Sequence, residues 1–235
     1  MFEEILNTIE NEDLKELAQE MIKTIPDYFY HVPASSTGKY HPDYCLGEGG
    51  LYRHTIALCR ILNHILTVSK YSSRDKDLMR IAGIMHDTRK SGTQEQYKEN
   101  KFTKFDHPLL SAAVVRSFKG KDWNDEEIEI IANAIESHMG QWNTDKRSDV
   151  VLPLPENKYQ MLVHWADYLA SRKDIEVKFN YQIAEVDPVM PFGKYKGVKI
   201  VDLPLDYCQW CVDNMTHLRE PLMLAIKDRL KKDGV

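Results

Sequence analysis

IAGIMHDTRKSG, residues 81–92, is the stretch on which the fold and chemistry of this chain depend. A nearly continuous apolar run, Ile81 to Met85, leads directly into His86 and Asp87, and two basic residues follow at once. Such a run predicts a buried helix. The polar pair after it has two interpretations: Asp87 caps the end of the helix, or the two side chains supply adjacent ligands to a metal ion.

The composition is that of an ordinary globular protein. The 235 residues are 43% hydrophobic and 29% charged, which is enough for one large domain plus a small appendage. No stretch approaches 18 consecutive apolar residues, so we expect no membrane span. The acidic, amphipathic N-terminus does not read as a signal peptide, which favours a cytoplasmic location. The net charge of -5 argues against a broad surface for duplex nucleic acid.

Helical periodicity dominates the first 180 residues. It predicts an opening helix or helix pair that ends before Pro26, followed by helices over 51–69, 75–86, 107–118, 125–138 and 156–178. Between them, residues 31–50 form a long loop of the kind that is usually functional. After Asp187 the glycines and alternating lysines of residues 189–204 predict a short hairpin, then two closing helices. The prediction is a mainly all-α domain over 1–186 and a small α+β module over 187–235.

Two histidines lie on the apolar faces of predicted helices. His54 shares a stripe with Leu58 and Ile61, and His138 follows the apolar positions of its helix at the C-terminal end. Either residue has an alternative explanation, His54 as a core histidine and His138 as a cation at a helix C-terminus.

His107 and Asp167 are ambiguous in the same way. His107 lies just ahead of a helix that Pro108 begins, where it is either a neighbour of the Asp106 cap or a ligand. Asp167 lies in an apolar helix interior, which is unfavourable unless a metal or a salt bridge to a nearby Arg or Lys compensates the charge. One shared explanation for these residues is a metal site. Imidazoles and carboxylates without thiolates suit Mn, Fe, Ni, Co, Zn or Mg.

The order of these residues resembles the HD-domain superfamily of metal-dependent phosphohydrolases. The resemblance covers about residues 31–178 and rests on five motifs in family order, GGLYRHT, IMHDTRKSG, HPLLSAA, IESHMG and HWADYLAS. It implies an all-α helical bundle with two divalent ions. One ion would be held by His54, His86, Asp87 and Asp167, and Asp87 would bridge to a second ion held by His107 and His138.

Within the superfamily these motifs are most similar to those of a branch of bacterial 3′-to-5′ exoribonucleases. Met139 replaces the second histidine of a motif in that branch, and we expect no room for its N-terminal oligonucleotide-binding domain, so processive RNA degradation is not expected. The sequence MPFGKYKGVKIVDLPLDYCQW resembles a short module of some bacterial and phage DNA exonucleases. Its lysines and aromatic residues either contact phosphates and bases or form a solvated hairpin over a small core.

These features lead to a hypothesis of phosphoester hydrolysis. The substrate would be a nucleotide, a cyclic nucleotide or the 3′ end of a single-stranded nucleic acid, and the alternative is a non-catalytic module that senses a nucleotide. Beside the metal ligand Asp87, the candidate catalytic residues are Arg89 and Lys90, which either hold phosphate oxygens or are merely solvated. The candidate substrate-binding residues are Ser36, Lys39, His41, Arg116 and Gln141. No oligomeric state is predicted.

Overall fold

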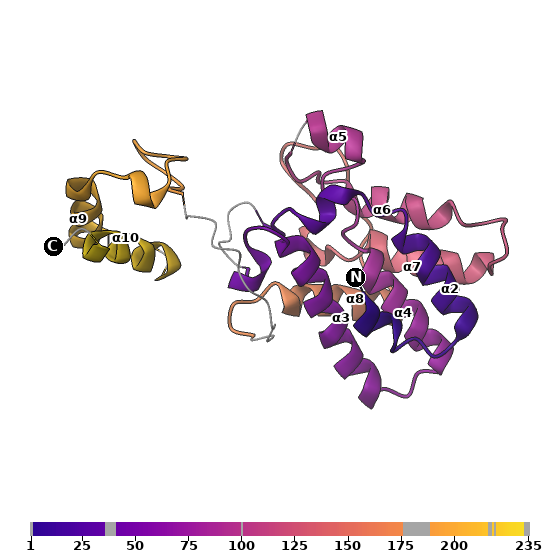
Figure 1. The fold of residues 1–235 in the computed structure, drawn as a ribbon. Helices are drawn as coiled ribbons and strands as arrows, with labels where there is room; N and C mark the ends of the chain where they lie inside the picture. The colour runs from indigo at the N-terminus through magenta and orange to yellow at the C-terminus, as the bar shows by residue number, and fades with distance from the viewer. Residues whose placement is uncertain are drawn as a thin grey trace. The chain divides into compact units, whose positions relative to one another are not determined.

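The computed structural model describes residues 2–35, 41–99, 101–175, 189–215, 218 and 220–232. The chain divides into two compact units, Met1–Phe179 and Asn180–Val235 (Figure 1). Across the described ranges every regular element is a helix, and β pairing is limited to two single bridges. The prediction of a mainly all-α fold is confirmed. The domain boundary predicted near residue 186 lies outside the described residues.

In its described residues the N-terminal unit is a bundle of α-helices with three short 3-10 helices. Its elements are α1 (Glu3–Leu6), α2 (Glu12–Ile22), η1 (Asp27–Tyr30), η2 (Asp43–Cys45), α3 (Gly50–Val68), α4 (Ser73–Met85), α5 (Gln94–Glu99), α6 (His107–Arg116), α7 (Asp125–Glu136), η3 (Gly140–Trp142) and α8 (Lys158–Ala170). None of the helices in the described ranges is both long and apolar enough to cross a bilayer.

Helix α4 lies at the centre of this unit. Its residues 77–85 are all buried, so the second half of the helix has no solvent-facing stripe. It packs against α2, α3, α7 and α8. The Ser72 side chain fixes its beginning by accepting a hydrogen bond from the Asp75 N–H at 3.1 Å. Because His86 and Asp87 follow α4 directly, this buried helix carries them into the interior.

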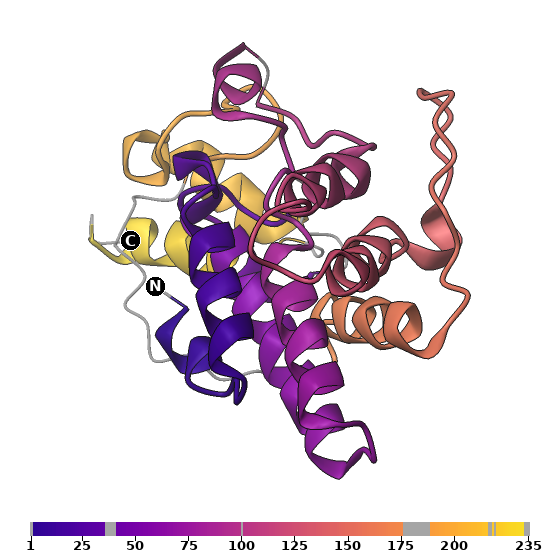
Figure 2. The same cartoon turned by 90° about the vertical axis from the view of Figure 1, so that its right-hand side faces the viewer.

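The helices that surround α4 have well-defined beginnings. At α7 the Asn124 side chain accepts hydrogen bonds from the N–H groups of Glu126 and Glu127. At α8 Asn157 and Gln160 form a capping box. Between η3 and α8 the chain turns back on itself, with a bridge between Thr144 and Val151, and this paired segment extends away from the helices (Figure 2).

A buried carboxylate joins α4 to the N-terminal helices. Asp77 is fully buried and accepts hydrogen bonds from the N–H groups of Glu10 and Asn11, both at 2.9 Å. It also forms an ion pair of 2.6 Å with Arg80. Asp77 therefore holds the turn that leads into α2 against the buried helix α4.

Replacing Asp77 with alanine is expected to lower the free energy of unfolding by about 3–5 kcal/mol, because Arg80 and the two N–H groups lose their buried partner. Urea unfolding followed by circular dichroism measures the loss. The control is Glu20→Ala, which removes an exposed ion pair with Lys23 and should cost at most about 1 kcal/mol. Equal losses in the two variants would show that Asp77 is not a structural anchor.

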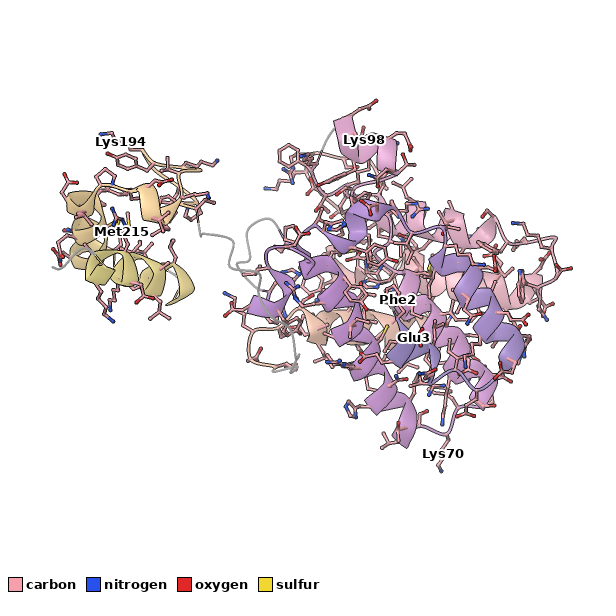
Figure 3. All side chains as sticks on the ribbon, in the orientation of Figure 1. Phe2, Glu3, Lys70, Lys98, Lys194 and Met215 are labelled. Atoms are coloured by element: carbon pink, nitrogen blue, oxygen red, sulfur yellow. The ribbon has the colours of Figure 1, made fainter. Side chains whose placement is uncertain are left out.

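The C-terminal unit has a small core of its own. Its described elements are η4 (Ile200–Asp202), α9 (Leu205–Asn214) and α10 (Glu220–Lys232). Its buried residues are Met190, Ile200, Leu203, Cys208, Cys211, Leu222, Ile226 and Leu230. Figure 3 draws the side chains of this unit, with Lys194 and Met215 labelled.

The predicted hairpin of this unit is shorter than expected. Met190 donates its N–H to the Val198 carbonyl at 2.8 Å, and a single bridge joins Val189 to Lys199. Gly197, with φ of +84°, donates back to the Met190 carbonyl at 2.7 Å. A tight turn closed by these contacts leaves too few pairs for a ladder.

Candidate metal centre

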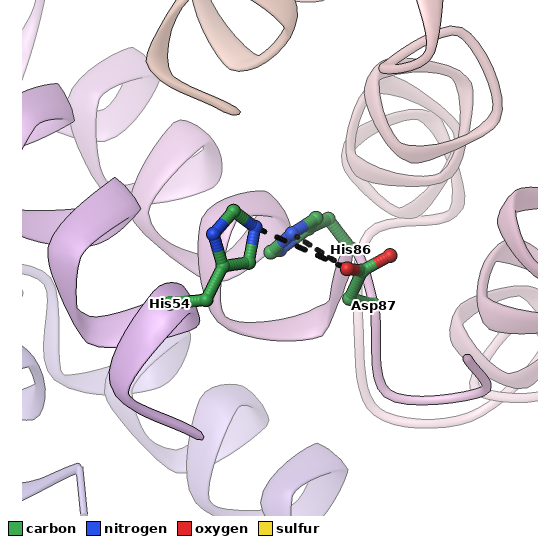
Figure 4. A group of neighbouring side chains, drawn as sticks. All are labelled: His54, His86 and Asp87. Atoms are coloured by element: carbon green, nitrogen blue, oxygen red, sulfur yellow. Dashed lines mark ion pairs between the residues drawn. The ribbon is translucent and has the colours of Figure 1, made fainter. Parts of the chain in front are cut away.

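Six side chains predicted as ligands come from five separate parts of the N-terminal unit. They are His54 near the start of α3, His86 and Asp87 at the end of α4, His107 at the start of α6, His138 just after α7 and Asp167 in α8. The structure brings all six together around Asp87. Figure 4 shows His54 and His86 facing the carboxylate of Asp87.

The two carboxylate oxygens of Asp87 face different histidines. Oδ1 lies 2.9 Å from Nε2 of His107 and 3.6 Å from Nε2 of His138. Oδ2 lies 3.5 Å from Nε2 of His86 and 4.0 Å from Nε2 of His54. Asp87 therefore stands between two sets of imidazoles, with one oxygen toward each.

A second carboxylate joins one of these sets. Oδ1 of Asp167 lies 2.9 Å from Nε2 of His54 and 3.8 Å from Nε2 of His86. An aspartate in the apolar face of α8 is thus compensated by imidazoles of α3 and α4. These contacts with two candidate ligands are what the metal interpretation of Asp167 expects.

Three of the histidines are held in one tautomer by the backbone. In His86, His107 and His138, Nδ1 lies 2.6–2.8 Å from the carbonyl oxygen of the residue three positions earlier. A carbonyl only accepts hydrogen bonds, so Nδ1 must carry the proton in each ring. In a neutral imidazole Nε2 is then left with a lone pair, as required of a metal ligand.

These lone pairs point at an acceptor. The Nε2 atoms of His86 and His107 and the Oδ1 atom of Asp87 are buried without a hydrogen-bond partner. The Nε2 lone pairs and the carboxylate oxygens repel one another. Burial, together with the charge of Lys90, lowers the pKa of His107 to about 4, so this ring does not take up a proton that would relieve the repulsion. A cation between the nitrogens and the carboxylate would satisfy all of these atoms.

The electrostatics of Asp87 keep it ionised. Burial by itself raises the pKa of this carboxyl group, but its neighbours, above all the positive charge of Lys90, hold the pKa well below its usual range. The residues form two potential ligand groups that share Asp87, namely His54, His86 and Asp87, and Asp87, His107 and His138. Nitrogen and carboxylate donors of this kind fit divalent metal ions.

The thiol beside the cluster is unsuited to metal binding. Sγ of Cys45 lies 3.8 Å from Nδ1 of His54, on the far side of that ring from Asp87. Burial raises the pKa of Cys45 strongly, so it remains a neutral thiol. Its contact with His54 was not anticipated from the sequence.

Lys90 and Arg89, which are neighbours in sequence, have different surroundings. Nζ of Lys90 lies 2.7 Å from Oδ2 of Asp87, within the cluster. The Arg89 guanidinium instead donates to the carbonyl oxygens of Thr24 at 2.8 Å and Thr88 at 3.3 Å. The structure thus brings Lys90 to the centre and uses Arg89 to connect the turn to the end of α2.

The turn that carries Lys90 is anchored from two sides. The buried hydroxyl of Tyr28 donates to the Gly92 carbonyl at 2.8 Å and accepts from the Ser91 N–H at 3.0 Å. Burial raises the pKa of Tyr28 to about 12, so the hydroxyl remains protonated. On the other side, Ser111 of α6 accepts the Arg89 N–H.

The remaining predicted substrate residues are scattered. The ring of His41 lies 5.9 Å from that of His54, beside the cluster. Arg116 lies nine residues beyond His107 on α6, roughly 13 Å along the axis, and its guanidinium is paired with Glu129 and Glu136. Gln141 is exposed in η3. Ser36 and Lys39 lie outside the described residues.

The residues that pack against the ligand-bearing segments were not predicted from the sequence. His164 donates from Nδ1 to the His138 carbonyl at 2.8 Å. A Cβ added to Gly140, which has φ of +54°, would lie 2.1 Å from the His164 ring. Likewise a Cβ on Gly50 would lie 2.3 Å from the Cys45 carbonyl oxygen, which explains a glycine four residues before His54.

The stability of the metal-free protein is expected to fall as the pH is lowered from about 6.5 to about 4. Burial, His54 and Lys90 lower the pKa of His41 to about 4, and the pKa of His107 is lowered to about the same value. In this window the unfolded chain binds protons at both residues that the folded chain does not. Urea midpoints at pH 7 and pH 5 with a chelator present measure the loss.

His41→Gln should reduce this pH dependence, because one of the two groups is gone. An identical urea midpoint for the unaltered protein at both pH values would contradict the prediction.

Comparison with known families agrees with this geometry. The family model of the HD domain matches residues 51–172, just over half of the chain, and that range contains all six ligands. A second family model, described as a putative quorum-sensing-regulated virulence factor, matches residues 181–215. No curated protein and no solved structure matches the chain significantly.

Proposed function

The chain belongs to the HD domain family, whose members are typically metal-dependent hydrolases, and we propose that it is a divalent-metal-dependent phosphohydrolase. The observation that carries the proposal is the convergence of buried Nε2 lone pairs on a carboxylate that has one oxygen toward each of two ligand groups. We further propose that the substrate is a nucleotide, a cyclic nucleotide or the 3′ end of a single-stranded nucleic acid.

The residues of the cluster have different roles in the proposed hydrolysis. Bound divalent cations polarise phosphoryl oxygens and make water more acidic, which phosphoester hydrolysis requires near neutral pH. Asp87 would serve as the shared ligand, and the backbone hydrogen bonds of His86, His107 and His138 keep their Nε2 lone pairs directed inward. Lys90 supplies a positive point charge for a non-bridging phosphate oxygen.

The central experiment is a hydrolysis assay with purified full-length protein. Mononucleotides, cyclic nucleotides and short oligonucleotides are incubated with Mn²⁺, Mg²⁺, Ni²⁺ or Co²⁺, and products are separated by chromatography. We expect turnover that a chelator abolishes. Tight nucleotide binding without turnover under any of these metals would contradict the proposal and favour a sensing module.

An aromatic surface of the C-terminal unit supports a polymeric substrate. The ring centroids of Tyr195 and Tyr207 are 4.6 Å apart, and Tyr207 stacks on Trp210 at 5.9 Å with an angle of 19°. Nζ of Lys194 lies 5.2 Å from the centre of the Tyr195 ring. Trp210 is half exposed, as is typical of a ring that stacks a base of a single strand.

Trp210→Ala and deletion of residues 187–235 separate the two substrate classes. Trp210→Ala is expected to weaken binding of a short oligonucleotide by roughly 5- to 150-fold, the range for one lost base stack, and the deletion by at least as much. Neither should alter hydrolysis of a mononucleotide, because the N-terminal unit keeps its own core. Steady-state kinetics on both substrates measure the effect, and equal losses would contradict the polymer interpretation.

A further inference from the structure

A half-exposed aromatic pair lies beside the candidate metal centre. The indole of Trp142 is 45% exposed and stacks on the ring of Tyr168, with centroids 5.6 Å apart and an angle of 15° between the planes. The two rings come from η3 and α8, far apart in sequence.

Both rings are connected to metal-ligand candidates. Tyr168 follows Asp167 directly on α8, and Trp142 lies four residues after His138. The ring of His164 lies 6.4 Å from that of Trp142, and its Nδ1 donates to the His138 carbonyl. The aromatic pair and the ligand cluster are therefore joined through a single buried histidine.

The ligand cluster is open to solvent on the side where Asp167 of α8 and Lys90 lie. The four ligand histidines and Asp87 have side chains at most 2% exposed, whereas Asp167 is 18% and Lys90 is 16% exposed. A phosphoryl group must therefore approach past Asp167 and Lys90. Tyr168 is the residue after Asp167 on α8.

The aromatic pair is fixed before any ligand arrives. The guanidinium carbon of Arg172, two residues beyond the end of α8, lies 4.5 Å from the centre of the Tyr168 ring. At the other end, Gly140 packs so closely on His164 that η3 has little freedom. Asn143, directly after Trp142, is held by hydrogen bonds with Leu152 at 2.9 and 3.1 Å. A rigid aromatic face loses little entropy when it stacks on a ligand.

We infer that Trp142, supported by Tyr168, stacks the base of a nucleotide whose phosphate lies at the Asp167 and Lys90 side of the cluster. The inference rests on the proposed phosphohydrolase function and specifies its substrate as one that carries a base. A flat, uncharged ring next to a phosphate site matches the two halves of a nucleotide, a planar base and an anionic group.

The test compares two diesters with the same leaving group, thymidine 5′-(p-nitrophenyl) phosphate and methyl p-nitrophenyl phosphate, with full-length protein. Trp142→Ala is expected to raise KM for the thymidine ester by roughly 5- to 150-fold and to leave the methyl ester unchanged. Trp142→Phe should restore most of the loss. Trp165→Ala, which removes an equally exposed tryptophan of α8, should have no effect.

A second measurement does not depend on turnover. AMP should quench the tryptophan fluorescence of the protein in the presence of a chelator, and Trp142→Ala should lose this quenching, whereas Trp165→Ala should keep it. Unchanged quenching in Trp142→Ala, equal KM changes for both esters, or competition by ribose 5-phosphate as strong as that by AMP would overturn the inference. If AMP quenching depends on Trp142 but the esters and the nucleotides of the hydrolysis assay above are all left intact, the hydrolase proposal fails and the base site stands.

Discussion

Asp87→Asn is expected to lower turnover by about 10³-fold or more and to remove bound divalent metal. The asparagine side chain has the same shape, but its single carbonyl oxygen cannot face both ligand groups. Its NH₂ group would also point at an Nε2 atom or at Lys90. Initial rates on the best nucleotide substrate, with metal content measured on the same sample, give the result.

His64→Ala is the matched control for this variant. His64 lies on α3 like His54, but its side chain is exposed and outside the cluster, so metal content and turnover should match those of the unaltered protein. If Asp87→Asn retains both metal and activity, Asp87 is the helix cap of the simpler interpretation and the site assignment is wrong.

Lys90→Met is expected to lower turnover by about 10²- to 10³-fold while metal remains bound. The Lys90 ammonium group lies 2.7 Å from Oδ2 of Asp87 at the open side of the cluster, where it can contact a phosphate oxygen without serving as a ligand. Methionine keeps the length of the side chain and removes the charge. The loss should appear in kcat, since stabilisation of developing phosphate charge acts on the transition state.

Arg89→Met provides the opposite expectation for the adjacent residue. Its guanidinium donates to two backbone carbonyls, so its loss should reduce the free energy of unfolding by about 1–3 kcal/mol and leave kcat near that of the unaltered protein. Equal effects of the two variants on kcat would show that both cations act on substrate, contrary to the contacts described above.

The sequence was sufficient for the main helices of the N-terminal unit because their apolar periodicity is strong. Helix α4 begins and ends within two residues of the predicted range, since Ser72 caps it and polar residues follow Asp87. Helix α5 was missed because none of its six residues is buried and it therefore has no apolar stripe. Helix α8 ends at Ala170, eight residues earlier than predicted, because the charged residues after it continue the helical pattern by composition alone.

The candidate ligands were identifiable as a set because each interrupts an apolar face or ends a helix, and because their order resembles a known family. Their supporting contacts were not identifiable. The Nδ1 hydrogen bonds of His86, His107 and His138 depend on backbone carbonyls, which every sequence provides. The stack of Trp142 on Tyr168 joins positions 26 residues apart and exists only after α7 and α8 pack together.

Adjacent residues of like charge were the hardest to separate from sequence. Arg89 and Lys90 have the same sign and the same position after the helix, and either could bind a phosphate. Their roles differ because the turn after Asp87 directs one side chain to the end of α2 and the other back to the carboxylate. Arg116 was likewise a candidate for substrate binding in the sequence, but in the structure its guanidinium is paired with Glu129 and Glu136 of α7.

The central claim is that one carboxylate, Asp87, is shared by two ion sites. Elemental analysis of full-length protein and of His107→Ala, each equilibrated with Mn²⁺ and then desalted, tests it most directly. The account predicts about two ions per chain in the unaltered protein, one for each ligand group, and about one in His107→Ala, which keeps His54, His86 and Asp167. No bound ion in the unaltered protein, or the same ratio in both proteins, would contradict it.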